Sequence, residues 1–122
     1  MKQSIRLAPP NSIFFLEDSS GGKIPKIDDR APNIWSTRSC IIIGSLCEMD
    51  GETELIASTS ASDAPSIPPT FEGMLDTPSG IVVISTSEQE VLLRCGVKTH
   101  FTRVRVWTDH PVEPDHIKVV FG

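Results

Sequence analysis

Short clusters of apolar residues, separated by residues that favour turns, run along the whole chain. The clusters are rich in Ile, Val, Leu and Phe, and Gly, Pro, Asp and Ser fill the gaps between them. No segment keeps an apolar repeat of about 3.6 residues over three turns, as an amphipathic helix would. The pattern predicts about eight strands, at residues 3–7, 11–18, 34–48, 53–58, 80–86, 91–95, 99–108 and 116–121.

This succession of strands predicts an all-β fold, either an antiparallel β-sandwich or a Greek-key barrel. Residues 1–122 fit one domain of ordinary size. Two longer segments, at residues 19–32 and 59–70, are rich in Pro, Ser, Gly or Asp and are expected to be extended connections.

The strongest apolar cluster lies within residues 34–48, where Ile41 to Ile43 stand in sequence. Three consecutive β-branched residues favour a strand buried on both faces. The dipeptide Asp50-Gly51 follows, and Asp-Gly is typical of a type I′ hairpin turn because both central residues of that turn need positive φ. We therefore expect residues 34–48 and 53–58 to pair as an antiparallel hairpin.

The segment THFTRVRVWT, residues 99–108, alternates strictly between two kinds of side chain. One face is suited to the core and carries Thr102, Val104 and Val106. The other face carries Phe101, Arg103, Arg105 and Trp107. Aromatic residues and arginine are enriched at binding hot spots, so this row is the candidate binding surface. The alternative is that another strand or residues 19–32 cover the row, with the arginine stems packed along the sheet.

Charge narrows the choice of partner. The chain has 11 Lys and Arg against 16 Asp and Glu, a net charge of −5. An acidic balance argues against non-specific nucleic-acid binding, which depends on neutralising phosphates. It is compatible with a basic protein partner, and equally with no partner. No apolar run approaches the roughly 20 residues that span a bilayer, and the first residues lack the apolar stretch of a signal peptide, so we expect a cytoplasmic protein.

The three cysteines are predicted to be small buried hydrophobic side chains. Cys40 and Cys47 fall on one predicted strand, where seven residues span roughly 23 Å, beyond the reach of a disulfide. Cys95 lies on another predicted strand. No Cys-x-x-Cys pair is present, so the sequence does not favour a structural zinc site.

No established catalytic motif is present: there is no nucleophile elbow, dinucleotide fingerprint or phosphate-binding loop. The densest polar cluster is DHPVEPDH, residues 109–116, with two imidazoles and three carboxylates. Such groups can ligate zinc or manganese. The alternative is an ordinary solvated loop, stiffened by Pro111 and Pro114.

Several features resemble small bacterial β-sandwich proteins of the competence J type. They are the early strand FFLED at residues 14–18, a lone Trp35 before a buried strand, and the late succession GIVVIST, TRVRVW and HIKVVF. The resemblance rests on strand order and apolar pattern, and it covers the second half of the chain together with residues 14–18. It implies a β-sandwich and, because that family resembles nuclease inhibitors, a nuclease as partner. It identifies no functional residue.

The main hypothesis is a non-catalytic protein-binding domain, of the inhibitor or immunity type, that masks a basic partner such as a nuclease. Phe101, Arg103, Arg105 and Trp107 are its expected contact residues. The acidic loops at Asp28-Asp29 and residues 109–115 would form a steering rim, that is, an acidic border of the contact surface that attracts the basic partner. No cofactor, catalytic residue or metal ligand is assigned. The alternative hypothesis is a metal-binding domain or metal-assisted enzyme that uses residues 109–116. Edge strands in an open sandwich can pair between two chains, so a homodimer is a further alternative.

Overall fold

The computed structural model describes all of residues 1–122 and contains ten β-strands and two single-turn 3₁₀ helices. The strands are β1 Lys2–Leu7, β2 Ile13–Asp18, β3 Ile34–Ser36, β4 Cys40–Gly44, β5 Thr53–Ser58, β6 Phe71–Asp76, β7 Ile81–Ser85, β8 Val91–Gly96, β9 Phe101–Thr108 and β10 His116–Phe121. The 3₁₀ helices are η1 Pro10–Ser12 and η2 Ala61–Asp63. Neither of these short helices could span a membrane.

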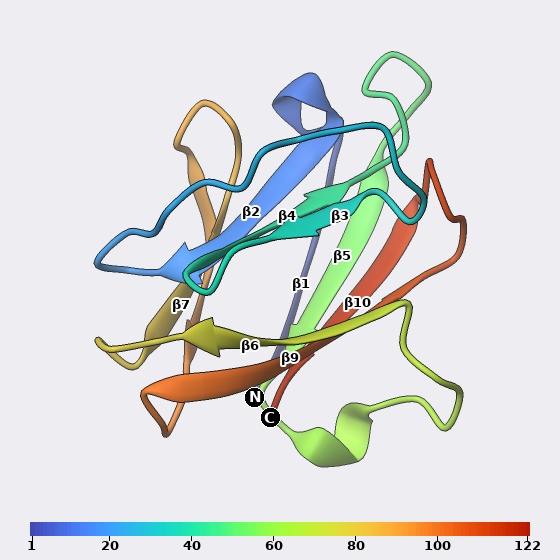
Figure 1. Ribbon diagram of the computed structural model, residues 1–122. Coiled ribbons are helices and arrows are strands. Elements are labelled where there is room, and N and C mark those ends of the chain that lie inside the picture. Colours follow the sequence, from blue (N-terminus) through green and yellow to red (C-terminus); the bar gives the residue numbers. More distant parts are fainter.

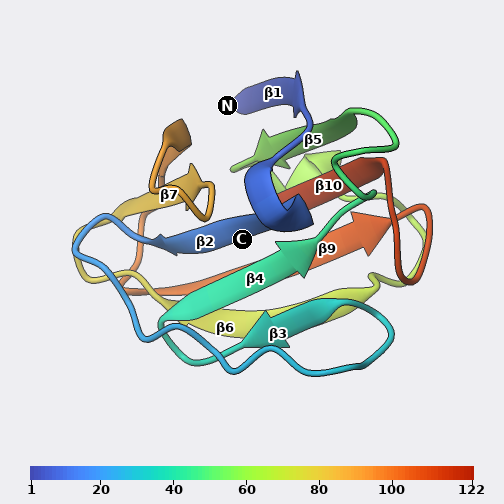
Figure 2. The same cartoon turned by 90° about the horizontal axis from the view of Figure 1, so that it is seen from above.

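Two five-stranded sheets lie face to face (Figures 1 and 2). Sheet A has the spatial order β1-β5-β10-β9-β6, and sheet B has the order β3-β4-β2-β7-β8. Every neighbouring pair is antiparallel except β5 and β10, which run parallel. The structure thus confirms the prediction of an all-β sandwich.

Alternating side chains from both sheets fill the space between them. A single cluster of 17 buried residues forms this core. On β9 the predicted inward residues Thr102, Val104 and Val106 are all buried. On β10, Ile117 and Val119 point the same way. Each large apolar side chain removed from water contributes roughly 1.5–3 kcal/mol, so this alternation is the main source of stability.

Strand β4 is buried on both faces, as its run of isoleucines predicted. Ile41 and Ile43 enter the central core. Ile42 points outward and packs with Cys40 and with Trp35 of β3, in a second small cluster outside sheet B. Sheet B therefore needs a covering layer on its outer face as well.

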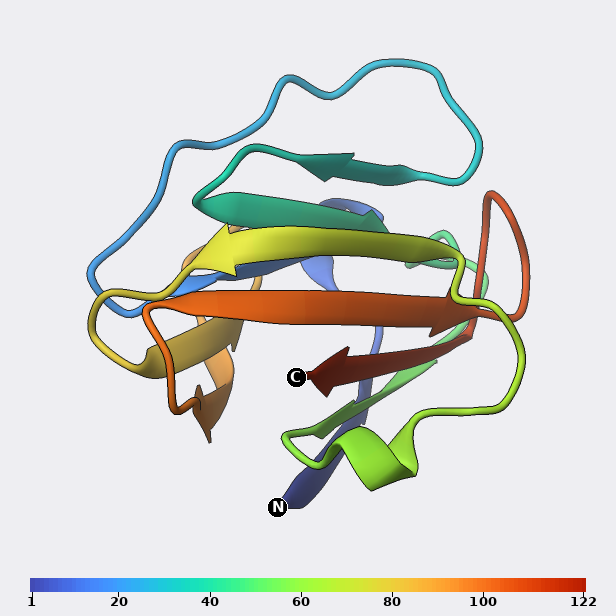
Figure 3. The same cartoon turned by 60° about the horizontal axis from the view of Figure 1, so that its bottom comes forward.

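Residues 19–33, here called the sheet B strap, supply that cover (Figure 3). Trp35 donates its indole N–H to the backbone oxygen of Asp28 at 3.0 Å. Further along the strap, the Lys23 backbone N–H donates to the Ser39 hydroxyl at 2.8 Å. Gly22 packs so closely that an added Cβ would lie 2.0 Å from the Ser39 backbone oxygen. The strap is thus held against β3 and the β3–β4 turn.

The prediction of one strand over residues 34–48 was wrong. The chain turns back at residues 37–39, so that β3 and β4 pair as an antiparallel hairpin. The Thr37 hydroxyl accepts hydrogen bonds from the backbone N–H groups of Ser39 and Cys40, which stabilises the reversal. Cys40 and Cys47 consequently do not share a strand. Cys40 and Cys95 are buried as predicted, whereas Cys47 is half-buried.

The predicted hairpin at Asp50-Gly51 was also wrong. β4 and β5 belong to different sheets, and residues 45–52 cross from sheet B to sheet A. The turn lies earlier, where the Asp50 backbone N–H donates to the Cys47 oxygen at 2.8 Å. Gly51 has φ of 143°, so its conformation still favours glycine.

Sequence reasoning missed β6 altogether. Its six residues, FEGMLD, include two carboxylates and a glycine, which are unfavourable in strands. It forms because it pairs along its whole length with the strongly alternating β9. β6 is therefore an edge of sheet A.

The close approach at Gly22 gives a direct test of the sheet B strap. Gly22→Ala should lower the free energy of unfolding by roughly 1–3 kcal/mol, because the new methyl group meets backbone that cannot move aside cheaply. Gly96→Ala is the matched control, since nothing lies within 4 Å of a Cβ there. It should stay within about 0.5 kcal/mol of the parent. Equal denaturant midpoints for the two variants would show that the strap is not held at Gly22.

Candidate protein-binding surface

The four residues of the candidate row do share the outer face of β9, but their exposure falls along the strand. Phe101 is 56% exposed and Arg103 is also exposed. Arg105 is half-buried, and Trp107 retains only 7% of its surface. The row is thus open at one end and covered at the other.

Residues 59–70, here called the sheet A strap, cover Trp107. The Trp107 indole N–H donates to the Ile67 backbone oxygen at 3.0 Å. Nearer β5, the Ser58 hydroxyl donates to the Asp63 carboxylate at 2.5 Å and ties down η2 (Figure 3). Trp107 is therefore part of the packed structure, and its cover comes from this segment rather than from residues 19–32. Trp107 thus lies on the outer face, as predicted, but it is covered, so the alternative of a covered row holds at this end of the strand, with a different covering segment.

Arg105 is also used by the fold. Its guanidinium donates to the Gly122 backbone oxygen at 2.9 Å and lies 5.7 Å from the centre of the Trp107 ring. Its Nε is buried without a hydrogen-bond partner. Arg105 therefore supports the covered end of the row.

The open end of the row joins β6 in an exposed patch. Met74 of β6 lies opposite Arg103 in the sheet register, diagonal to Phe101, and is 57% exposed. Arg103 Nε lies 3.0 Å from a carboxylate oxygen of Glu72, and both side chains are about half exposed. Two large apolar side chains beside a solvated ion pair form a mixed surface of the kind found in protein interfaces.

One end of the sandwich is acidic. It is built from residues 45–52, 86–90 and 109–115, together with η1, and most of it lies at the top of Figure 1. Hydrogen bonds join these segments, such as Leu46 N–H to the Pro114 oxygen at 2.7 Å. The three segments contain no Lys or Arg and hold half of the 16 carboxylates: Glu48, Asp50, Glu52, Glu88, Glu90, Asp109, Glu113 and Asp115.

The opposite end has no such excess of carboxylates; there Arg38 lies 3.7 Å from Asp76, and Asp18 accepts hydrogen bonds from Ser79. Residues 37–39, 77–80 and 97–100 meet there, through bonds such as Val97 N–H to the Gly80 oxygen at 2.8 Å. These segments hold Arg38 and Lys98 and no carboxylate. The net charge of the chain is therefore unevenly distributed, with its negative field at the first end, here called the acidic end.

Asp28 does not add a free charge to a steering rim. Its carboxylate accepts two hydrogen bonds from Arg30, at 2.7 and 2.8 Å, and a third from Trp35. The bonds from Arg30, opposed by desolvation and helped by Trp35, hold the pKa of Asp28 at about 2. Asp29 is exposed.

Residues 109–116 use most of their polar groups to hold their own turn. Asp109 accepts from the backbone N–H groups of Asp115 and His116, at 3.1 and 3.2 Å. His116 Nδ1 lies 2.8 Å from the Asp115 carboxylate, and bonds to Asp115 and Asp109 raise the pKa of His116. His110 accepts two backbone N–H groups of the turn, at 2.9 and 3.1 Å. Ligating atoms of Asp109, Asp115 and His116 lie within 4.8 Å of one another, and His110 is not part of this group.

Two of the three thiols, Cys40 and Cys95, lie in surroundings unsuited to a nucleophile. Burial, aided by the nearby Glu17 charge, raises the pKa of Cys40 to about 12. Burial also raises the pKa of Cys95. Thiolate is the reactive form of cysteine, and these surroundings disfavour it.

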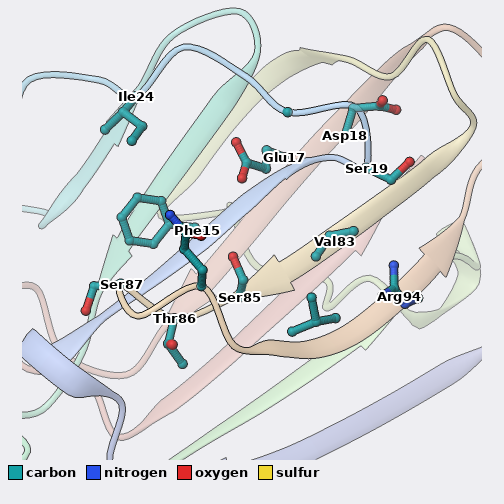
Figure 4. A pocket seen from close by; sticks show the side chains of 13 residues that line it. Phe15, Glu17, Asp18, Ser19, Ile24, Val83, Ser85, Thr86, Ser87 and Arg94 are labelled. Atoms are coloured by element: carbon teal, nitrogen blue, oxygen red, sulfur yellow. The ribbon is translucent and has the colours of Figure 1, made fainter.

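A groove on the outer face of sheet B was not predicted (Figure 4). It has a volume of about 390 Å³, and the first part of the sheet B strap, with Ser19, Gly21 and Ile24, lines it together with the sheet. Its floor comes from β2, β7 and β8, and includes Phe15, Glu17, Val83, Ser85 and Arg94. The alternation of FFLED held the signal, since Phe14 and Leu16 enter the core and leave Phe15 and Glu17 on the other face.

Two solved structures resemble the chain along nearly its whole length. One is ComJ from Bacillus subtilis, an inhibitor of the DNA degrading activity of NucA, with a TM-score of 0.66 and 9% identity over 98% of this chain and 93% of ComJ. The other is the product of crocagin biosynthetic gene J, with a TM-score of 0.50 and 12% identity over 98% and 94%. The likeness is one of fold, and it agrees with the resemblance noted in the sequence. No protein-family model and no curated protein sequence matches the chain.

The two ends of the candidate row should respond differently to truncation. Trp107→Ala should lower the free energy of unfolding by roughly 3–5 kcal/mol, because it empties a packed site and frees the sheet A strap. Arg103→Ala should cost no more than about 1 kcal/mol, since its ion pair with Glu72 is solvated. Denaturant melts of both variants check this. A Trp107→Ala variant as stable as the parent would mean that the strap does not depend on this side chain.

Proposed function

We propose that this chain is a non-catalytic inhibitor that binds and masks a basic protein partner, and that the partner is a nuclease. The fold shared with ComJ along nearly the full length of both chains is the observation that carries the proposal. Because one β-sandwich fold can host many functions, the proposal also draws on the surface of this particular chain.

The acidic end supports a basic partner. Proteins that cleave nucleic acid need a positive surface to hold the phosphates. An end with eight carboxylates and no Lys or Arg in its three segments presents a complementary field. The same field would repel a second copy approaching end to end, so we do not propose a homodimer through this end.

The contact surface we propose includes the row on β9. Phe101 and Arg103, at its open end, are free to touch a partner, with Met74 beside them. Arg105 and Trp107 hold the covered end rigid, and the exposed Ile67 of the sheet A strap lies above Trp107. We place the protein in the cytoplasm, where its three free thiols would stay reduced.

Capture and inhibition test this function directly. The immobilised chain should retain a basic protein from a lysate of the source cells, and that protein should degrade DNA once it has been eluted from the chain. Adding free chain to the captured nuclease should suppress the degradation, reaching completion near one chain per nuclease. A captured fraction with no nuclease activity, or one that the chain leaves fully active, would contradict the proposal.

Charge variants distinguish attraction by the acidic end from an effect of net charge alone, when the rate of association with the captured nuclease is measured. Asp50→Asn with Glu52→Gln removes two exposed charges of the acidic end, and should slow association roughly three- to tenfold at low salt but little at high salt. Ala61→Lys with Ser62→Lys raises the net charge equally on η2, and should change the rate less. Equal effects of the two pairs would show that the acidic end has no special part.

A further inference from the structure

The groove on sheet B holds a carboxylate with no cation beside it. Glu17 projects from β2 and forms no salt bridge, and Asp18, the next residue, already accepts four hydrogen bonds from Ser20 and Ser79. Burial raises the pKa of Glu17, and a hydrogen bond from the Gly22 backbone opposes part of that rise. The charged form of Glu17 is therefore partly desolvated and lacks a counter-ion.

The surroundings of Glu17 suit a flat cation. The Phe15 ring lies on the same face of β2, one alternation away, and Figure 4 shows the two side chains next to each other. Ser85 lies opposite Phe15 on β7, and its hydroxyl makes no hydrogen bond within the chain. An aromatic face, a carboxylate and a free hydroxyl together match a guanidinium group, which stacks on rings and donates in several directions.

The charges around the groove also favour a cation. Arg94 is the one basic residue among its lining residues. It lies two strands from Glu17 in the register Glu17–Val83–Arg94, which separates the backbones by roughly 10 Å. The turn at residues 86–90 forms the rim and carries Glu88 and Glu90. Because that turn belongs to the acidic end, the groove adjoins the end proposed to attract a basic partner, on the sheet opposite the β9 row.

We propose that this groove is a subsite for an arginine side chain of the partner, with the guanidinium between Phe15 and Glu17. The subsite rests on the proposed function for its biological occupant. It adds a fixed point of recognition to the long-range attraction of the acidic end, since a charge pair formed in a groove is screened less than one in open water.

The experiment uses a small probe, so that it does not depend on any nuclease. Backbone amide NMR signals of the isotope-labelled chain are followed during titration with N-acetyl-arginine amide. The matched control ligand is N-acetyl-citrulline amide, which has nearly the same shape but no charge. The arginine probe should shift signals of β2 and β7 around Phe15, Glu17 and Ser85, and should bind at least about tenfold more tightly than the citrulline probe.

Two variants complete the test. Glu17→Gln should remove the preference for arginine while leaving the melting temperature unchanged, and Arg94→Gln should keep or increase it. In the parent chain the affinity should rise as the pH rises through the pKa of Glu17, because the carboxylate is the binding form. Shifts located elsewhere, equal binding of both probes, or a preference that survives Glu17→Gln would each overturn the subsite. A failure of nuclease capture would leave these outcomes unchanged, so the two proposals fail separately.

Discussion

The structure depends on one constraint, namely that each sheet carries large apolar side chains on its outer face as well as on the face that forms the core. Between the sheets, the alternating side chains make a single core. On the outer face of sheet B, Trp35 and Ile42 would be exposed to water without a cover. On the outer face of sheet A, Trp107 would be exposed in the same way. Each face is covered by a proline-containing strap, and each strap accepts a tryptophan indole N–H at a backbone oxygen, both at 3.0 Å. A buried indole needs such a partner, so the two tryptophans fix where the straps lie.

The straps also decide which surfaces remain free. On sheet A the open area is the β6–β9 side, with Phe101 and Met74. On sheet B it is the groove over β2, β7 and β8, with Phe15 and Glu17 (Figure 4). Both areas combine apolar and charged side chains, and the acidic end adjoins the groove at residues 86–90. The surfaces available to the proposed partner are therefore those that the chain's own loops leave uncovered.

The pattern of apolar and polar residues within a segment predicted the features that depend on that segment alone. The alternation on β9 correctly separated inward from outward residues, and the isoleucine run correctly indicated a strand buried on both faces. The prediction of a hairpin at Asp50-Gly51 failed because β4 and β5 belong to different sheets. Packing decides which sheet a strand joins, and a dipeptide does not encode that. Trp107 was placed on the right face, but its cover comes from Ile67, 40 residues away in sequence. The alternation of FFLED indicates that Phe15 and Glu17 face outward, but the groove also needs β7 and β8, which that segment alone does not place beside them.

The central claim is that the partner touches the free surfaces and the acidic end, while the parts of the straps that only cover the sheets stay outside the contact. These parts are residues 25–33 and 59–66, because Ser19, Gly21 and Ile24 line the groove and Ile67 lies over Trp107. Backbone hydrogen exchange, measured on the chain alone and in complex with its captured partner, tests this most directly. We predict slower exchange in residues 86–90 and 45–52, and on β6 and β8, the exposed edges beside the free surfaces, with little change in residues 25–33 and 59–66. Protection confined to residues 25–33 and 59–66 would contradict this claim, since the partner would then be bound by the covering loops themselves.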